Sequence, residues 1–202
     1  LAWDTRTGTL AIFGFVLLIG SGLRIAVRAD RSFDKLLATG LTTIIGAQAF
    51  IIIGGVIKGR PRDSFFIGTK IYLPRDESTG LPKETATEQF FLSRLDTSLK
   101  RLGLDYVDIL YHHNVWKRES ALYEPALKAL EKAKKEGKVR HVGLTTHRNE
   151  PEVIHAAVDS KFYEVIEVAY NHRQKHQAKI REALAKAGSA GLGVVAMKTL
   201  GG

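Results

Sequence analysis

The sequence predicts an α/β fold with a parallel sheet, preceded by a two-helix apolar hairpin. From Arg60 onward, short apolar runs alternate with amphipathic segments, and this order indicates right-handed βαβ units. Five strands could form an open doubly wound sheet or part of an eight-stranded barrel. The composition changes abruptly near Lys58. Two domains are therefore expected, one over residues 1–58 and one over residues 59–202.

Residues 8–57 predict a membrane hairpin. They hold two apolar runs, each of about the 20 residues that cross a bilayer, on either side of a basic connector. Frequent glycines suit helices that pack closely within a membrane. A secretory signal peptide fits poorly, because the basic cluster follows the first apolar run. A pair of buried helices in a soluble domain is the alternative; the hairpin interpretation makes a lipid bilayer a partner of residues 8–57.

The elements after residue 60 follow from apolar spacing and turn residues. Strands are expected at 65–70, 106–112, 138–146, 165–170 and 193–197. Helices are expected from Thr85 or Thr87 to Leu102, and at 123–136, 151–159 and 177–187. Gly103 suits the left-handed conformation that ends a helix. The stretch from Ser98 to Asn114 thus combines a helix end, a turn, a buried strand and two histidines at the strand's carboxyl end.

Composition excludes several classes of site. The chain has no cysteine, which rules out disulfides, thiolate metal sites and cysteine nucleophiles. The formal net charge is +9, but the lysines mostly alternate with acids on helix faces. No recognition motif accompanies this charge, so no nucleic-acid partner is expected. The sequence begins without methionine and stops directly after an apolar run, which leads us to expect a fragment.

Polar residues at the strand ends are the candidates for chemistry, because these ends meet on one face of a parallel barrel. They are Thr69-Lys70, His112-His113-Asn114, Thr145-Thr146-His147, Tyr170-Asn171 and Met197-Lys198. A lysine there can depress the pKa of an adjacent acid, or its side chain can simply extend to water. Lysine and histidine on consecutive strands favour a site. Adjacent strand residues point to opposite faces, so His112 and His113 do not share a metal ion, and no metal is expected.

Five motifs in order carry a family resemblance for Arg60–Gly202. They are RPRDSFFIGTK, SLKRLGLDYVDILYHHN, ALEKAKKEGKVRHVGLTTH, EVAYN and GLGVVAMKTLGG. This part of the chain resembles the aldo-keto reductases. The resemblance implies an incomplete (β/α)8 TIM-type barrel, spanning about strands 3–7 with their helices. It also implies hydride transfer between NADPH and a small carbonyl substrate, with a tyrosine as proton donor assisted by lysine, histidine and aspartate.

The resemblance assigns roles to individual residues. Lys70 matches the lysine that lowers the tyrosine's pKa, and His113 matches the histidine that orients the substrate carbonyl. The cofactor-binding positions are Thr145, Thr146, Glu167 and Met197, where many members have Ser, Asn, Gln and an aromatic ring. The family's tyrosine and aspartate come from the first two strand units, which the hairpin replaces. The implied activity is therefore impaired.

Residues 7–57 resemble a different family. The stretch LRIAVRADRSFDKLLATGLTTIIGAQAFIIIGGVI is similar to a helix–loop–helix of the FtsW/RodA/SpoVE proteins, which polymerise peptidoglycan. The alternative function is therefore a non-catalytic membrane fragment of such a polymerase within a chimeric chain. The hairpin would make the protein membrane-associated, whereas the reductase part is expected in the cytoplasm.

Overall fold

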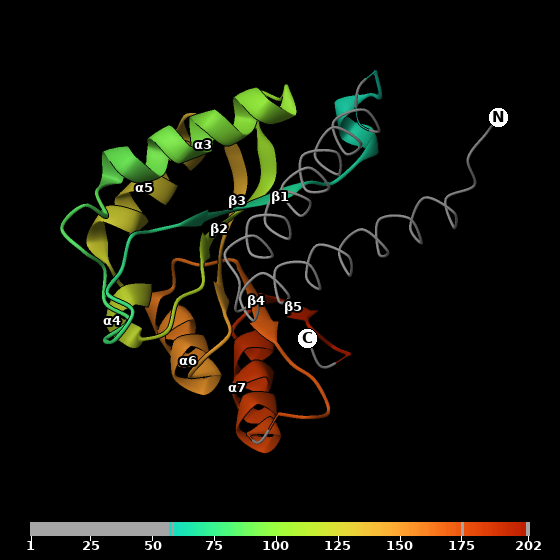
Figure 1. Ribbon diagram of the computed structural model, residues 1–202. Coiled ribbons are helices and arrows are strands. Elements are labelled where there is room, and N and C mark those ends of the chain that lie inside the picture. Colours follow the sequence, from blue (N-terminus) through green and yellow to red (C-terminus); the bar gives the residue numbers. More distant parts are fainter. Residues whose placement is uncertain (1–56, 58, 175, 201–202) are drawn as a thin grey trace, which may run out of the picture. The chain divides into compact units, whose positions relative to one another are not determined.

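The computed structural model describes Ile57, residues 59–174 and residues 176–200 (Figure 1). The chain comprises two compact units, Leu1–Phe65 and Phe66–Gly202. The hairpin expected over residues 8–57 lies outside the described residues, apart from Ile57. Within the described ranges, no helix is both long and apolar enough to span a membrane. The first unit contributes one described element, the 3-10 turn Arg62–Ser64.

The second unit is a parallel sheet of five strands alternating with helices. The sheet order is β1-β2-β3-β4-β5, and every neighbouring pair is parallel. The strands are β1 (Gly68–Tyr72), β2 (Val107–His113), β3 (Val139–Thr146), β4 (Val165–Ala169) and β5 (Gly193–Met197). The helices are α3 (Glu88–Leu102), α4 (Arg118–Ala121), α5 (Glu124–Lys135), α6 (Glu150–Ser160) and α7 (Gln177–Ser189).

The hydrophobic core lies between the sheet and its helices. In Figure 1, α3 lies beside α5, and α6 lies beside α7; both pairs are in contact. The helices supply buried side chains such as Phe91 and Ile180, and the strands supply Leu110, Leu144 and Ile166, all fully buried. The order of strands along the chain matches their order in the sheet, as expected for successive βαβ units.

The first strand differs from the expected one. The prediction placed a short buried strand at 65–70, whereas β1 spans Gly68–Tyr72, and only Ile71 in it is buried. The reason lies at Ile67, whose N–H donates to the Asp108 carboxylate instead of a strand partner (2.8 Å). The Ile67 carbonyl accepts from the backbone N–H groups of Asp108 and Ile109, and the regular pairing begins at Gly68. Helix α4 was not predicted, because four residues are too few for a periodic signal.

Helix α3 begins and ends at the residues that the sequence indicates. The Thr87 hydroxyl accepts a hydrogen bond from the Phe90 N–H (3.1 Å), which makes Thr87, and not Thr85, the N-cap. Gly103 adopts φ 65°, and its N–H donates to the carbonyl groups of the last turn. The predicted start and end of this helix are confirmed.

Removing the cap at Thr87 is expected to lower stability by about 1 kcal/mol, because the Phe90 N–H then has no protein acceptor. Urea unfolding of the Thr87→Ala variant measures this loss. Thr97→Ala is the matched control, since that hydroxyl donates to the Ser93 carbonyl within the same helix, on an exposed face. Equal midpoints for the two variants would contradict the capping role.

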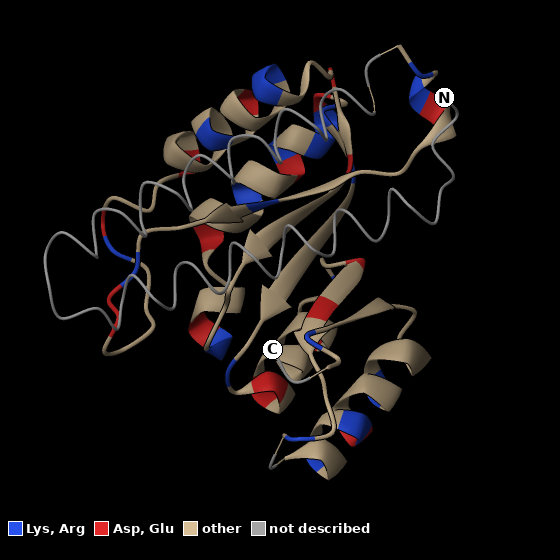
Figure 2. Ribbon diagram, turned by 45° about the vertical axis from the view of Figure 1, so that its right-hand side comes forward, with Lys and Arg blue, Asp and Glu red and all other residues tan. Residues whose placement is uncertain are grey.

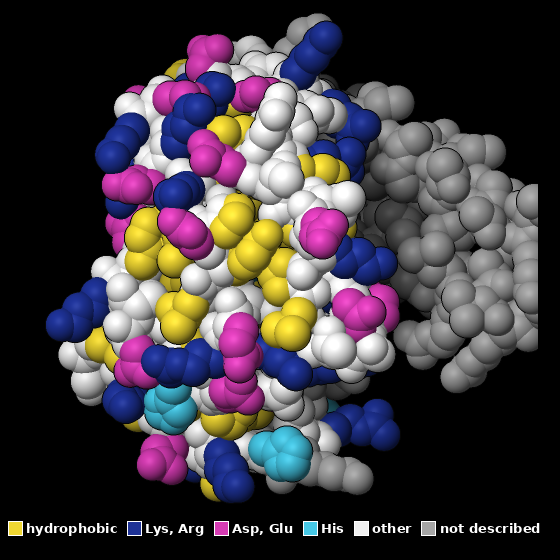
Figure 3. All heavy atoms as spheres, turned by 90° about the vertical axis from the view of Figure 1, so that its left-hand side faces the viewer, with side chains coloured by type: hydrophobic (Ala, Val, Ile, Leu, Met, Phe, Trp, Pro, Cys, Tyr) yellow, Lys and Arg dark blue, Asp and Glu magenta, His cyan; other side chains and the backbone are white. Residues whose placement is uncertain are grey.

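Charged residues lie mainly on the helices and loops, and the strands are mostly uncharged (Figure 2). On the face shown in Figure 3, lysines and arginines are interspersed with aspartates and glutamates. Helix α5 shows the pattern in detail, with ion pairs one turn apart between Lys128 and Glu124 (2.7 Å) and between Lys135 and Glu131 (2.8 Å). The excess positive charge is therefore spread over a mixed surface on this face.

Candidate active site

The face of the sheet opposite the helices, here called the inner face, carries most of the candidate side chains. Alternate strand residues point to opposite faces. Leu110 and His112 are buried, and the His112 ring packs edge-on against Phe91 of α3 (6.3 Å between centroids). Tyr111 and His113 therefore point to the inner face. By strand register, the matching positions on the other strands are Lys70, Tyr72, Thr145, Glu167 and Met197.

An ion pair crosses the inner face. The Lys70 Nζ atom lies 2.6 Å from Glu167 Oε1, although β2 and β3 lie between their strands. In a flat sheet these strands would be about 14 Å apart, at about 4.8 Å per step. The short distance therefore requires the sheet to curl toward this face. The Glu167 side chain is 11% exposed and that of Lys70 is 38% exposed, so the carboxylate is the more enclosed partner.

Gly143 makes room for the ring beneath this ion pair. A Cβ atom at Gly143 would lie 2.7 Å from Tyr111 Cδ1 and 2.7 Å from the Val165 carbonyl oxygen. The Tyr111 ring occupies that space, and the Lys70 ammonium lies 5.8 Å from the ring centroid. Burial raises the pKa of Tyr111 to about 12, and the Glu167 carboxylate adds to the shift. Tyr111 thus keeps its proton at neutral pH.

Gly143→Ala is expected to lower stability by about 2 kcal/mol, because the new methyl group forces both the Tyr111 ring and the β4 backbone to move. Gly188→Ala in α7 is the control, since a Cβ there meets nothing within 4 Å. Gly188→Ala replaces a glycine inside a helix and is expected to raise the free energy of unfolding by up to about 1 kcal/mol. Thermal unfolding of both variants checks the opposite signs; a neutral Gly143→Ala would show that the ring is not confined.

His113 is held at the carboxyl end of β2. Its Nδ1 atom lies 2.8 Å from the Thr145 Oγ1 atom of β3, and the Asn114 N–H donates to the same oxygen (2.8 Å). The Val115 N–H donates to the Thr145 carbonyl (2.8 Å), so the loop after β2 is bound to β3 twice. Asn114 adopts φ 60°, a left-handed conformation that asparagine tolerates.

Two histidines face each other at this end of the sheet and are held neutral. The rings of His113 and His147 are 5.8 Å apart and edge-to-face. Burial lowers the pKa of His113, and the Lys70 ammonium lowers it further, against the opposing effect of Glu167. Burial lowers the pKa of His147 to about 4, with a further contribution from Lys198. Neutral imidazole can donate one hydrogen bond and accept another.

The other predicted residues lie on different faces or at different depths of the sheet. Thr146 points to the opposite face from Thr145, and its hydroxyl donates to the Arg148 carbonyl (2.8 Å). Met197, at the end of β5, is half-buried at an inner-face position. The expectation that Lys70 ends its strand is wrong, because β1 continues to Tyr72. The extra residues are paired with β2, and Lys70 therefore lies deeper in the sheet, beside Tyr111.

A cation–aromatic stack beside the histidines was not predicted. The Arg75 guanidinium lies 3.5 Å from the Trp116 ring centroid, and Arg148 lies 4.2 Å from the same ring. Arg75 also donates to the Asn114 carbonyl, which fixes the turn that follows His113. Arg75 belongs to the loop between β1 and α3. A single sequence gives no signal for this long-range pairing, since 41 positions separate Arg75 from Trp116.

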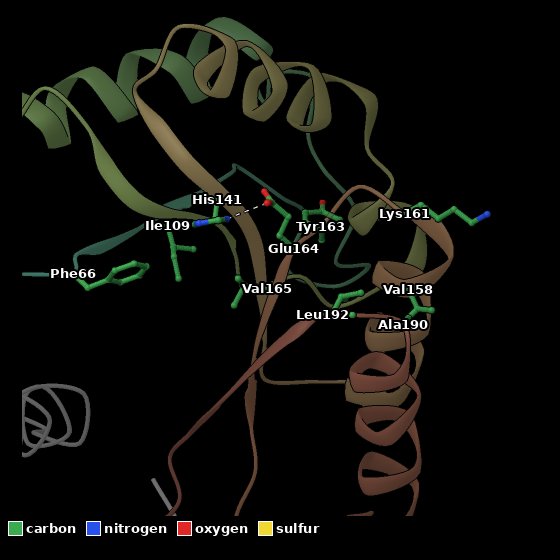
Figure 4. Close-up of a pocket in the computed structure, with 11 residues that line it drawn as sticks. Phe66, Ile109, His141, Val158, Lys161, Tyr163, Glu164, Val165, Ala190 and Leu192 are labelled. Atoms are coloured by element: carbon green, nitrogen blue, oxygen red, sulfur yellow. Dashed lines mark hydrogen bonds and ion pairs between the residues drawn. The ribbon is translucent and has the colours of Figure 1, made fainter. Parts of the chain in front are cut away.

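A pocket lies at the opposite, amino ends of the strands (Figure 4). It has a volume of about 720 Å³, and Phe66, Ile109, Val165 and Leu192 give it apolar walls. Lys161 and Glu164 are among its lining residues, and the Glu164 carboxylate pairs with His141 (3.0 Å) and with Lys134 (2.6 Å). Since parallel α/β folds place their chemistry at the carboxyl ends of strands, the Lys70–His113 end is the candidate active site.

The residues available for a cofactor fit the predicted set only in part. Met197 offers an apolar surface on the inner face, and Lys198 beside it offers a positive charge. The hydroxyl of Thr145 is engaged by His113 and Asn114, and Glu167 is engaged by Lys70. The cofactor roles of Thr145, Thr146, Glu167 and Met197 thus stay predictions. No cluster of three or more potential metal ligands occurs among the residues that the structure describes.

Comparisons with known proteins agree on one family. The model of the Aldo/keto reductase family matches residues 29–202. An L-glyceraldehyde 3-phosphate reductase of Escherichia coli (strain K12) is 37% identical over 89 residues, which cover 44% of this chain and 25% of that protein. The NADP(+) aldo-keto reductase yakc of Schizosaccharomyces pombe is 33% identical over 84 residues, which cover 42% of this chain and 24% of that protein. The chain thus spans about a quarter of these curated relatives.

The solved structures show the same fold. An aldo-keto reductase of Bacillus halodurans, in its holo form, superposes with a TM-score of 0.57 at 21% identity, covering 73% of this chain and 47% of that one. The family match begins at residue 29, inside the segment expected to be a membrane hairpin. The resemblance of residues 7–57 to FtsW/RodA/SpoVE proteins receives no support from these comparisons. Since the family model matches most of the sequence, the chain belongs to the aldo/keto reductase family.

Proposed function

We propose that this chain reduces small carbonyl compounds with NADPH, through Lys70 and His113 on the inner face, and at an impaired rate. The observation that supports this most is the convergence of Lys70, Glu167 and His113 from three different strands. The proposal also rests on family membership and on a relative named as an NADP(+) enzyme. When bound, the cofactor supplies the hydride that reaches the carbonyl carbon.

Two groups of the chain would act on the carbonyl oxygen. The neutral His113 imidazole can donate a hydrogen bond to this oxygen and so orient the carbonyl. The Lys70 ammonium would stabilise the negative charge that develops on it. The Glu167 carboxylate holds the Lys70 ammonium in place across the sheet.

The impairment follows from the tyrosines. The sequence has none before Tyr72, so the proton donor that the resemblance implies on an earlier strand has no counterpart here. Burial raises the pKa of both Tyr72 and Tyr111, and each therefore releases its proton less readily than a free tyrosine. The carbonyl oxygen would then take its proton from water, and this step would be slow.

The proposal is tested with the 202-residue chain, NADPH and a small aldehyde. NADPH fluorescence should change on binding, and aldehyde should then cause slow consumption of NADPH. A parallel titration with NADH tests the cofactor preference. Failure to bind either nucleotide, or binding with no aldehyde-dependent oxidation, would overturn the proposed function.

A further inference from the structure

We propose that Thr145 is a positioning residue that holds the His113 imidazole in the tautomer with its proton on Nε2. The value of this tautomer for carbonyl reduction rests on the proposed function, but the tautomer itself does not. The inference starts from three atoms: His113 Nδ1, Thr145 Oγ1 and the Asn114 backbone nitrogen.

The direction of the two hydrogen bonds follows from the number of protons available. A backbone N–H can only donate, so Asn114 donates to Thr145 Oγ1 over 2.8 Å. The hydroxyl has one proton of its own. If His113 Nδ1 also donated to Oγ1, this proton would need another acceptor, and Thr145 is fully buried. No such acceptor occurs among the described residues, so the hydroxyl donates to Nδ1 over 2.8 Å.

Because Nδ1 accepts, the proton of a neutral imidazole must lie on Nε2. The His113 side chain is half-buried, and its Nε2 atom makes no hydrogen bond to the described part of the chain. An N–H group is thus left on the inner face, free to donate. The groups around the ring favour the neutral form: Lys70, Arg75 and Lys198 lower the pKa of His113 beyond the effect of burial, and only Glu167 opposes them.

The surrounding contacts make this arrangement rigid. The Thr145 backbone carbonyl accepts from Val115, so both the side chain and the main chain of Thr145 bind the loop that follows His113. Arg75 holds the Asn114 carbonyl from the other side. This assignment also changes the expected role of Thr145 from gripping a cofactor to orienting the catalytic histidine.

Nitrogen-15 NMR of the histidine side chains in the 202-residue chain tests the proposal directly. Two-bond couplings distinguish an Nε2–H from an Nδ1–H imidazole, and His113→Gln identifies the signal. We expect the Nε2–H pattern in the wild type. Thr145→Val keeps the shape and removes the hydroxyl, and it should shift the His113 signal toward a mixture of tautomers. Thr145→Ser should restore the wild-type pattern.

Thr146→Val is the matched control, because its hydroxyl lies on the other face of the same strand. It should leave the His113 signal unchanged. An Nδ1–H pattern in the wild type, or a Thr145→Val signal identical to it, would overturn the proposal. If Thr145→Val does not fold, Thr145→Ala, which also removes the hydroxyl, and the wild-type pattern decide.

Kinetics separates this role from cofactor binding. Thr145→Val should lower kcat for aldehyde reduction by about tenfold, with the NADPH dissociation constant unchanged. A rise in that dissociation constant at unchanged kcat would instead show that Thr145 grips the cofactor. A chain without any reductase activity would overturn the proposed function, and the NMR result would still decide the tautomer.

Discussion

Replacing Lys70 with methionine is expected to lower the rate of NADPH-dependent aldehyde reduction by about 100-fold or more. Methionine keeps a long unbranched side chain and removes the positive charge. The ammonium is anchored 2.6 Å from the largely enclosed Glu167 carboxylate, and a charge fixed in place stabilises a developing alkoxide better than mobile water does. Steady-state consumption of NADPH at saturating cofactor measures the effect.

The same substitution also leaves the Glu167 carboxylate without its partner. Since Lys70 is partly open to solvent, the resulting loss of stability is expected to be only about 1–2 kcal/mol. The double variant Lys70→Met/Glu167→Gln removes both charges and should recover most of this stability without recovering the rate. A rate that returns together with the stability would show that Lys70 acts only through the fold, and an unchanged rate in Lys70→Met would exclude the catalytic role.

The fold was predictable because its signals are local. The capping threonine and Gly103 define α3, and β5 has the predicted bounds, 193–197. The start of β1, the strand at one edge of the sheet, was not predictable. The start of β1 depends on the Asp108 carboxylate, which replaces a strand partner for the Ile67 N–H, and these residues are 41 positions apart.

The residue types of the candidate site were predictable from the sequence, but the contacts between those residues were not. Lys70 was identified as a polar residue at an expected strand end, although β1 continues to Tyr72. Alternation along β2 separates His113 from the buried His112. The ion pair from Lys70 to Glu167 needs a curled sheet, whose curvature no single segment encodes. The bond from Thr145 to His113 depends on the register between β2 and β3, which neither strand specifies alone.

Lowering the pH from 7 to 5 is expected to destabilise the protein by about 2 kcal/mol through His112 alone. Burial lowers the pKa of His112 from its ordinary value of 6.5 to about 4, and electrostatic repulsion by His113 and Arg75 adds to this shift. Between these two values the unfolded chain binds a proton that the folded chain does not. Acid therefore favours unfolding, and the loss approaches about 3 kcal/mol by pH 4.

The pH range from 7 to 5 separates the titration of His112 from that of the carboxylates. Asp76, whose pKa is lowered to about 2 by hydrogen bonds from Ser78 and Thr79, contributes only below its ordinary value of 3.8. The pKa of His147 is lowered to a similar value, so His147 titrates in the same pH range and adds its own share to the slope. Urea unfolding at a series of pH values between 7 and 5 gives the slope of stability against pH.

His112→Leu should remove His112's share of that slope and also raise stability at pH 7. The His112 Nδ1 atom is buried without a hydrogen-bond partner in the described part of the chain, and leucine fills the space beside Phe91 with no polar atom to desolvate. His172→Gln, at an exposed position, is the control and should keep the full slope. An unchanged slope in His112→Leu would mean that His112 is protonated inside the fold, and the acid sensitivity would then belong to the inner-face histidines.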